Sequence, residues 1–304
     1  MSYRHILLAL LVAVVWGFNF VVIKIGLGEA PPFAFAFLRY IFAGLPLFLF
    51  IKRPAISIGM LIAIGLSMGF VKFSFLFVGV DLGISSGLGS LVLQSQAFFT
   101  IILSLFVFDQ RLTWKQGLGV FIAFSGIFFI GFEMHTKSSL TGLVCVLCAA
   151  FSWATSNILV RKAGPLDSFA LIVWTSLVPP IPLLIMSYTF EGGTETFIRI
   201  WQQLDRTGVG CILYIAWVAT WIGGTAWAKL MRLYPPSTVA PYSLLIPVFA
   251  FLSGWLVLGE TVSLKVMMAS SLVFVGLAIN QWPSRRQSSV ASSNQNASLD
   301  KKAA

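Results

Sequence analysis

The sequence predicts an all-α integral membrane protein in which ten transmembrane helices form two inverted five-helix repeats. Three observations lead to this fold: the composition, the succession of apolar runs, and a self-similarity within the chain. Of the 304 residues, 58% are hydrophobic and only 10% are charged, whereas an average soluble domain has about 25% charged residues. A soluble protein of this size could not bury so many apolar side chains, so lipid must surround much of the chain.

Apolar runs of membrane-spanning length follow one another with short polar connections. A helix needs about 20 mainly apolar residues to cross the hydrocarbon core. Charged residues, proline and glycine separate ten runs, which lie near 6–27, 33–51, 57–80, 84–107, 114–132, 140–160, 168–189, 208–230, 236–258 and 263–282. Residues 283–304 are polar and have nothing to bury, so we expect a disordered tail there.

The lysines and arginines are distributed unevenly between the two sides of these spans. With the N-terminus in the cytoplasm, thirteen of the 20 Lys and Arg residues fall on the cytoplasmic side, as the positive-inside rule requires. We therefore expect both termini to be cytoplasmic. The formal net charge of +10 follows from the same bias and implies no nucleic-acid partner.

The chain also resembles itself. Residues 86–130 align with 236–280 without a gap, so that Phe99 falls on Phe249 and Gly126 on Gly276. Trp16 and Trp153 occupy matching positions in the first span of each half. Because five spans is an odd number, the two halves must cross the membrane in opposite senses. We assign 1–135 to the first repeat, 136–282 to the second and 283–304 to the cytoplasmic tail.

Inverted repeats are typical of secondary transporters, which bind substrate near the membrane midplane between the halves. The sequence has no phosphate-binding loop of the kind that ATPases use. An intramembrane enzyme would need a nucleophile and a base at membrane depth, and we find no such pair, so we expect no catalysis. No cofactor is expected, and Cys145 with Cys148 is a poor metal site without His or acidic neighbours. A channel is the remaining alternative, although the repeat favours a carrier.

Three strings carry a family resemblance: WGFNFVVIK at 16–24, GSLVLQSQAFFT at 89–100 and APYSLLIP at 240–247. They resemble the EamA family of the drug/metabolite transporter superfamily, and within it the bacterial exporters of O-acetylserine and cysteine. The resemblance implies a carrier in the bacterial inner membrane that exports small amino-acid metabolites by alternating access. Its expected partners are such a metabolite and the lipid bilayer, with a monomer as the simplest assembly.

The chain departs from that subgroup in the third span, where it carries Lys72 and Asp81. The alternative substrates are therefore another organic anion or a metabolite linked to a sugar or nucleotide. A charge in the hydrocarbon core costs about 2.5–3.5 kcal/mol on insertion scales, so intramembrane lysines usually face an aqueous cavity. We expect Lys72 to bind a substrate anion there, with snorkelling to the interface as the alternative. Arg39 has the same two alternatives.

Further candidate substrate-binding residues lie at similar depth. Asn19, Gln94, Gln96 and Asn157 carry amides that need partners inside the membrane, and bonds to neighbouring helices would serve as well as bonds to a ligand. Aromatic rings can receive an amino group through cation–π contact, although such rings more often pack against helices or lipid. The aromatic candidates are Trp16, Phe20, Phe73, Trp153, Tyr214 and Tyr242.

Overall fold

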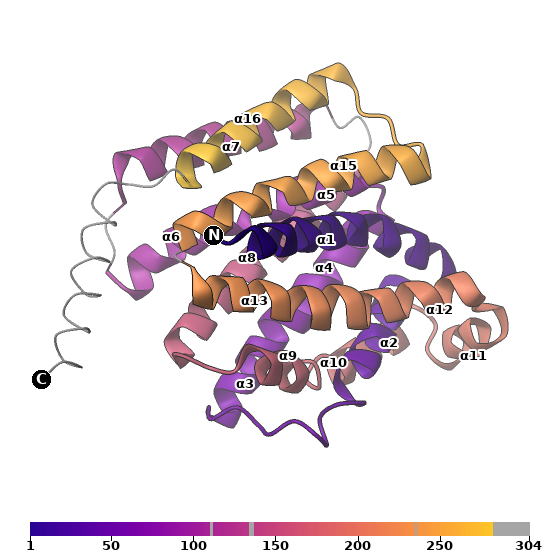
Figure 1. Cartoon of the computed structure of the whole chain (residues 1–304). Helices are drawn as coiled ribbons and strands as arrows, with labels where there is room; N and C mark the ends of the chain where they lie inside the picture. Colours follow the sequence, from indigo (N-terminus) through magenta and orange to yellow (C-terminus); the bar gives the residue numbers. More distant parts are fainter. Residues whose placement is uncertain (110–111, 134–136, 235, 282–304) are drawn as a thin grey trace, which may run out of the picture.

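The computed structural model describes residues 1–109, 112–133, 137–234 and 236–281, and within these the chain is helical throughout (Figure 1). The predicted tail and the junction between the two predicted repeats lie outside the described residues. The first half contains α1 (Tyr3–Glu29), α2 (Pro32–Gly44), α3 (Ile58–Gly65), η1 (Leu66–Val71), α4 (Lys72–Asp81), α5 (Ser86–Leu93), α6 (Gln96–Val107) and α7 (Trp114–Phe132).

The second half contains α8 (Lys137–Ala163), α9 (Ser168–Thr175), α10 (Pro180–Phe190), α11 (Thr194–Gln203), α12 (Arg206–Leu213), η2 (Tyr214–Gly223), α13 (Gly224–Leu233), α14 (Pro236–Val239), η3 (Ala240–Leu244), α15 (Leu245–Leu258) and α16 (Leu264–Gln281). Among the described residues, 8 helical stretches are long and apolar enough to cross a membrane. At the other two expected spans lie α2 and α16, which are shorter apolar helices.

The second span ends earlier than the expected 33–51, because α2 stops at Gly44. Pro46 has no N–H, so it leaves the carbonyl of Phe42 without its helical donor. That carbonyl instead accepts a hydrogen bond from Trp217 Nε1 at 3.1 Å, and the carbonyl of Ala43 accepts one from Trp221 Nε1 at 2.9 Å. The early end of α2 thus provides attachment points for the second half of the chain.

The third span of each half is interrupted by a π-helical segment, η1 in the first and η2 in the second. A π-helical turn shifts the backbone hydrogen bonds by one residue, and such turns are frequent at functional sites. The carbonyl of Ser67 in η1 accepts a bond from Ser152 Oγ at 2.7 Å, and the carbonyl of Ala219 in η2 accepts one from Trp16 Nε1 at 2.9 Å. Each π-helical segment is therefore held by the long first helix of the opposite half, α8 or α1.

The helices α7 and α16 lie side by side along one edge of the bundle (Figure 1). A Cβ atom on Gly276 would lie 2.5 Å from the carbonyl oxygen of Gly119, and one on Gly119 would lie 2.8 Å from that of Gly276. Two helical turns further along α7, a Cβ atom on Gly126 would lie 2.7 Å from the carbonyl oxygen of Ala269. Such close backbone approach requires small residues and is typical of helix pairs in membranes.

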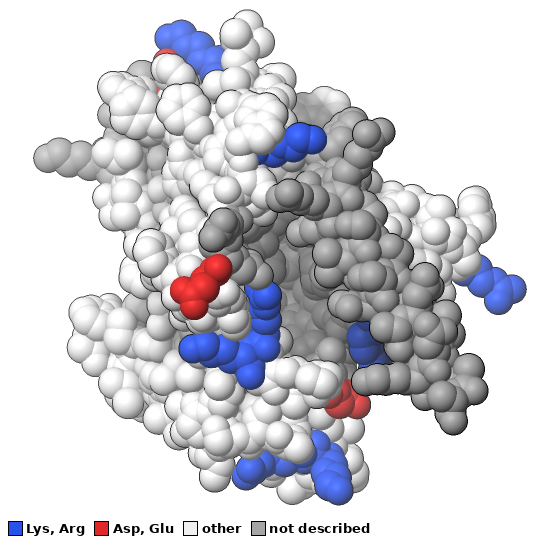
Figure 2. Space-filling model, turned by 90° about the vertical axis from the view of Figure 1, so that its left-hand side faces the viewer, with Lys and Arg blue, Asp and Glu red and all other residues white. Residues whose placement is uncertain are grey.

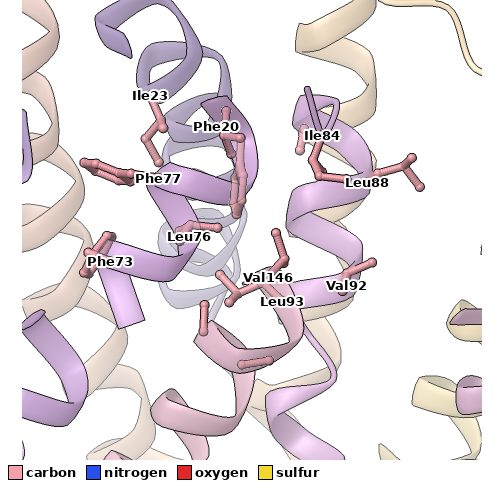
Figure 3. Close-up of a cluster of buried hydrophobic side chains, with 14 of the residues drawn as sticks. Phe20, Ile23, Phe73, Leu76, Phe77, Ile84, Leu88, Val92, Leu93 and Val146 are labelled. Carbon is pink, nitrogen blue, oxygen red and sulfur yellow. The ribbon is translucent and has the colours of Figure 1, made fainter. Parts of the chain in front are cut away.

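The hydrophobic core lies where α1, α4, α5 and α8 meet, shown as a cluster of buried side chains in Figure 3. Phe77, Leu76, Ile84 and Val146 are among its most deeply buried members. Large apolar side chains elsewhere remain on the outside, for example Phe106, Phe121 and Trp255. An apolar exterior around an apolar core is expected of a helix bundle immersed in lipid, and the chain is a multi-pass membrane protein.

Candidate functional site

Lys72 opens α4 directly after the π-helical segment η1, and only 5% of its surface is exposed. Its Nζ lies 3.8 Å from the centroid of the Trp153 ring on α8 and 4.4 Å from that of Phe73. Met68, one turn earlier, brings its Sδ to 4.0 Å from the same nitrogen. Aromatic faces stabilise a desolvated ammonium by about 2 kcal/mol, which is less than the cost of removing an ammonium from water. Lys72 is therefore a buried cation whose surroundings only partly replace its hydration.

Arg39 on α2 is buried to the same degree, with 3% of its surface exposed. Its Cζ lies 3.8 Å from the centroid of Phe73 and 4.5 Å from that of Tyr40. Nη2 donates a hydrogen bond to Thr220 Oγ1 at 2.9 Å. Nε and Nη1 have no hydrogen-bond partner among the described residues. Arg39 and Lys72 thus contact the same Phe73 ring.

Among the residues that the structure describes, no carboxylate lies beside these two cations. The described Asp and Glu residues lie at helix ends or in connections: Glu29, Asp81, Asp109, Glu133, Asp167, Glu191, Glu195, Asp205 and Glu260. The ion pairs among the described residues are Lys24–Glu260 and Lys265–Glu133. A charge inside a protein is normally paired or hydrogen-bonded, because burial without a partner is costly. Two neighbouring buried cations without a carboxylate form a site that an anionic ligand would complete.

A cleft of about 300 Å³ approaches this site from one end of the bundle. It is lined by Ile64, Met68, Ser156, Asn157, Val160, Arg161, Leu171, Ile172 and Thr175, which come from α3, η1, α8 and α9. Met68 forms part of its wall and also contacts Lys72, so this side chain separates the cleft from the ammonium. A methionine side chain is unbranched and flexible, and a change of its rotamer would connect the two.

On the face shown in Figure 2, blue Lys and Arg side chains outweigh red Asp and Glu. Arg161, which lines the cleft, stacks its Cζ 4.2 Å above the ring of Phe108. Positive potential around a cleft raises the local concentration of anions. The cleft and the buried cations behind it therefore both carry positive charge and favour an anionic ligand.

A second polar group lies on the cleft wall, one helical turn beyond Trp153 on α8. Asn157 Nδ2 donates to Gln96 Oε1 at 2.8 Å and to Thr100 Oγ1 at 3.2 Å, both on α6. Residues four apart on a helix share a face, so Asn157 and Trp153 point to the same side of α8. The cleft thus has an amide cluster in its wall and a pair of cations behind it.

The opposite end of the bundle is closed by carboxylates that meet helix N-termini. Glu260 pairs with Lys24 Nζ at 2.6 Å and accepts hydrogen bonds from the backbone N–H of Ser86, at 3.1 Å and 2.9 Å, where α5 begins. Glu191 accepts bonds from the backbone N–H groups of Phe33 and Ala34, at 2.7 Å and 3.0 Å, where α2 begins. Carboxylates are favourable at helix N-termini, where unpaired N–H groups and the helix dipole are positive. The structure is therefore open at one end and closed at the other.

The structure brings six of the twelve predicted site residues into these two groups: Lys72, Arg39, Phe73 and Trp153 in one, Gln96 and Asn157 in the other. The other six lie elsewhere. Trp16 and Tyr214 donate to the backbone carbonyls of Ala219 and Val15, and Gln94 donates to that of Ser243. Phe20 belongs to the hydrophobic core, Tyr242 packs against a smaller cluster around Ala9, and Asn19 has a buried Oδ1 with no partner among the described residues.

Three residues that matter to this geometry were not predicted from the sequence: Thr220, Met68 and Glu260. Thr220 and Met68 lie within π-helical segments, which hydrophobic periodicity does not mark. Glu260 lies in a connection, where an acidic residue is unremarkable.

Comparison with known proteins identifies the family. The model of the EamA-like transporter family matches residues 4–132 and again 140–281. A probable amino-acid metabolite efflux pump of Salmonella typhimurium is 40% identical over 289 residues, which cover 92% of this chain and 95% of that protein. A protein of the same description from Escherichia coli is 38% identical over 286 residues, with 92% and 95% covered.

A more distant relative is an uncharacterized transporter of Bacillus subtilis, 26% identical over 290 residues, which cover 91% of this chain and 96% of that one. The family resemblance that the three sequence strings carried is thereby confirmed. Together with the helical bundle and its buried cations, these matches identify a membrane transporter, and the chain belongs to the EamA-like transporter family.

Proposed function

We propose that this protein exports small amino-acid metabolites across the bacterial inner membrane by alternating access, and that Lys72 and Arg39 bind the carboxylate of the substrate. O-acetylserine and cysteine are the reference compounds, because the subgroup resemblance in the sequence points to them. The observation that carries the proposal is the pair of buried cations around Phe73 with no carboxylate beside them among the described residues.

The free donors of Arg39 fit a carboxylate. A guanidinium binds two carboxylate oxygens through the parallel N–H groups of one edge, either Nε with Nη2 or Nη1 with Nη2. Nε and Nη1 of Arg39 have no partner among the described residues, and Nη2 gives one of its two N–H groups to Thr220, so its other N–H completes an edge with Nε or with Nη1. The bond to Thr220 fixes the orientation of the guanidinium. Lys72 adds a second charge from the side of the cleft. In a site with little water, each charge–charge interaction is stronger than at the surface.

Alternating access is supported by the two ends of the bundle. One end has a basic cleft that leads to Met68 and Lys72, while the other is closed by Glu260 and Glu191. The cleft lies at the end where α1 begins, which is the cytoplasmic side in the predicted orientation. This geometry corresponds to an inward-facing carrier ready to accept a substrate for export.

The inverted repeat is supported by contacts that exchange between the halves. In the predicted alignment Gly119 corresponds to Ala269 and Gly126 to Gly276, and in the structure Gly119 meets Gly276 while Gly126 meets Ala269. Such crossed contacts are expected of an isologous, two-fold-related helix pair. The two π-helical segments, each held by the first helix of the other half, follow the same pattern.

Export from living cells tests this function. A bacterium would express the wild type, Lys72→Met or Lys265→Met, and mass spectrometry would follow amino-acid metabolites in the medium. Lys265 is an exposed residue paired with Glu133, so its substitution removes a lysine far from the site. We expect the wild type and Lys265→Met to export alike and Lys72→Met to export at least tenfold less. If Lys72→Met exports as much as the wild type, Lys72 does not bind the substrate carboxylate. If the wild type exports none of these metabolites, the proposed function is wrong.

A further inference from the structure

The same site also restricts the rest of the substrate, in particular its amino group. A free amino acid carries an ammonium next to its carboxylate, and within a membrane protein this ammonium needs a carboxylate, an aromatic face or several oxygen acceptors. The part of the structure that is described supplies no Asp or Glu near Lys72 or Arg39, since its acidic residues lie at helix ends and in connections. A third cation beside these two would also be repelled by both.

Each of the three aromatic rings at the site already contacts at least one of the protein's own cations. Lys72 lies over Trp153 at 3.8 Å, Arg39 lies over Tyr40 at 4.5 Å, and both contact Phe73. A cation–π contact requires the cation within about 6 Å of the ring centroid and over the ring face. A substrate ammonium would have to compete with Lys72 or Arg39 for each of these three rings.

The amide cluster on the cleft wall offers a different partner. Both hydrogens of Asn157 Nδ2 are used, on Gln96 Oε1 and Thr100 Oγ1. This leaves Asn157 with its Oδ1, an acceptor, and Gln96 with its Nε2, a donor; neither atom has a hydrogen-bond partner among the residues that the structure describes. A secondary amide presents one N–H and one C=O that point in opposite directions, so Asn157 Oδ1 suits its N–H.

The two groups are spaced for a small ligand. Four residues on α8 separate Trp153, which covers Lys72, from Asn157, a rise of about 6 Å. Met68 links them, because it touches Lys72 and lines the cleft beside Asn157. A ligand with a carboxylate at one end and an amide next to it would reach both groups once Met68 moves aside.

We propose that the substrates are carboxylates whose amino group is acylated, with N-acyl amino acids as the class, and that the site discriminates against zwitterionic amino acids. This inference rests on the proposed function, export of amino-acid metabolites, and narrows its substrates to N-acylated forms rather than the zwitterionic reference compounds O-acetylserine and cysteine. In the bound state the carboxylate lies against Arg39 and Lys72, and the amide N–H faces Asn157 Oδ1. Acylation removes the one charge that the site has no group to receive.

Two isomers of one compound provide the test. O-acetylserine and N-acetylserine have the same atoms and the same carboxylate, but only the first keeps a free ammonium. Purified protein in proteoliposomes would be assayed for uptake of each isomer at mildly acidic pH, where the ester does not rearrange to the amide. We expect Vmax/KM to be at least tenfold higher for N-acetylserine.

The variant Asn157→Asp tests whether Asn157 contacts the substrate, because a purely structural role would not change the preference between the two isomers. The new carboxylate provides a partner for an ammonium, so the ratio of the two Vmax/KM values should shift toward O-acetylserine by at least tenfold. Because both isomers are measured on the same preparation, the ratio does not depend on how much of the variant folds. Thr155→Ala, on an exposed face of the same helix where Thr155 Oγ1 bonds only the carbonyl of Phe151 among the described contacts, should leave the ratio unchanged.

The outcomes separate the inference from the function on which it rests. Transport of O-acetylserine that equals or exceeds that of N-acetylserine would overturn the N-acyl inference while supporting export of amino-acid metabolites. Transport of neither isomer would contradict the proposed function and the inference with it.

Discussion

Lys24 and Lys72 both lie in apolar helices of the first half, yet the structure treats them in opposite ways. Lys24 meets the carboxylate of Glu260 at 2.6 Å and keeps 34% of its side chain exposed. Lys72 is almost fully buried and meets only rings and a thioether among its described contacts. The paired, partly exposed charge of Lys24 stabilises the closed end of the bundle. The buried charge of Lys72 has no carboxylate among its described contacts, so a bound anion would stabilise it. From this difference we infer that Lys24 has a structural role and that Lys72 binds the substrate.

The largest stability effect is expected from Glu260→Ala. This change leaves Lys24 without its carboxylate and removes the acceptor of the first backbone N–H of α5, that of Ser86. Loss of a cap together with a partly buried ion pair should lower the free energy of unfolding by about 2–3 kcal/mol. Thermal unfolding in detergent would measure the loss, with Glu195→Ala as a matched control from the exposed start of α11. Equal stability of the two variants would show that Glu260 does not close this end.

Lys72→Met should act in the opposite direction on stability. It replaces an unpaired buried cation by an apolar side chain of similar length, so the free energy of unfolding should rise by about 1–2 kcal/mol while transport is lost. Lys24→Met, in contrast, should destabilise by about 1 kcal/mol, because its pair is one-third exposed. Unfolding curves of both variants beside the wild type would decide. A destabilised Lys72→Met would mean that the ammonium has a partner that the comparison omits.

A smaller effect on transport is expected at Thr220. Thr220→Val removes the acceptor that orients Arg39 through its Nη2 and keeps the size of the side chain. We expect KM for a carboxylate substrate to rise about fivefold, with Vmax little changed, because only the positioning of one binding group is lost. Thr220→Ser retains a hydroxyl and should restore KM. A fall in Vmax in both variants would instead indicate a role of η2 in the conformational change.

The smallest effect is expected outside the membrane, at Asp205. The backbone N–H of Gly208, at 2.8 Å, donates to this carboxylate at the start of α12 and lowers its pKa below the ordinary value. A carboxylate with a lowered pKa contributes stability above its unfolded pKa of about 3.9, and the contribution is lost as pH falls through the lower folded value. Asp205→Asn should therefore flatten the pH dependence of unfolding below about pH 4 and change little at pH 7. An unchanged acid limb in the variant would contradict the assignment.

The sequence predicted the parts of this account that depend on composition and local spacing. The apolar runs indicated the spans, and membrane depth marked Lys72, Arg39 and Asn157 as candidates one at a time. Their grouping depends on contacts between distant parts of the chain: Lys72 with Trp153, Arg39 with Thr220, and Asn157 with Gln96. Periodicity within a single helix carries no information about such pairs.

The aromatic and amide candidates illustrate why some residues predicted to bind substrate lie away from the site. Trp16, Tyr214 and Gln94 all reach backbone carbonyls of other helices, and the sequence alone does not distinguish such a partner from a ligand. Two of these carbonyls become available through backbone irregularity: Ala219 lies in η2, and Ser243 lies in the 3₁₀ segment η3. Polar side chains inside the membrane were correctly expected to need partners, but the irregular backbone decided which partner each one found.

The central claim is that the unpaired cations Lys72 and Arg39 bind the carboxylate of the substrate. It is tested most directly by ligand-induced stabilisation of the purified protein, which requires no transport. A ligand at one hundred times its Kd stabilises the protein that binds it by about 2.7 kcal/mol. We predict that N-acetylserine raises the Tm of the wild type, and that neither its neutral carboxamide with the wild type nor N-acetylserine with Lys72→Met does so. An equal shift with the carboxamide, or an undiminished shift in Lys72→Met, would contradict the claim.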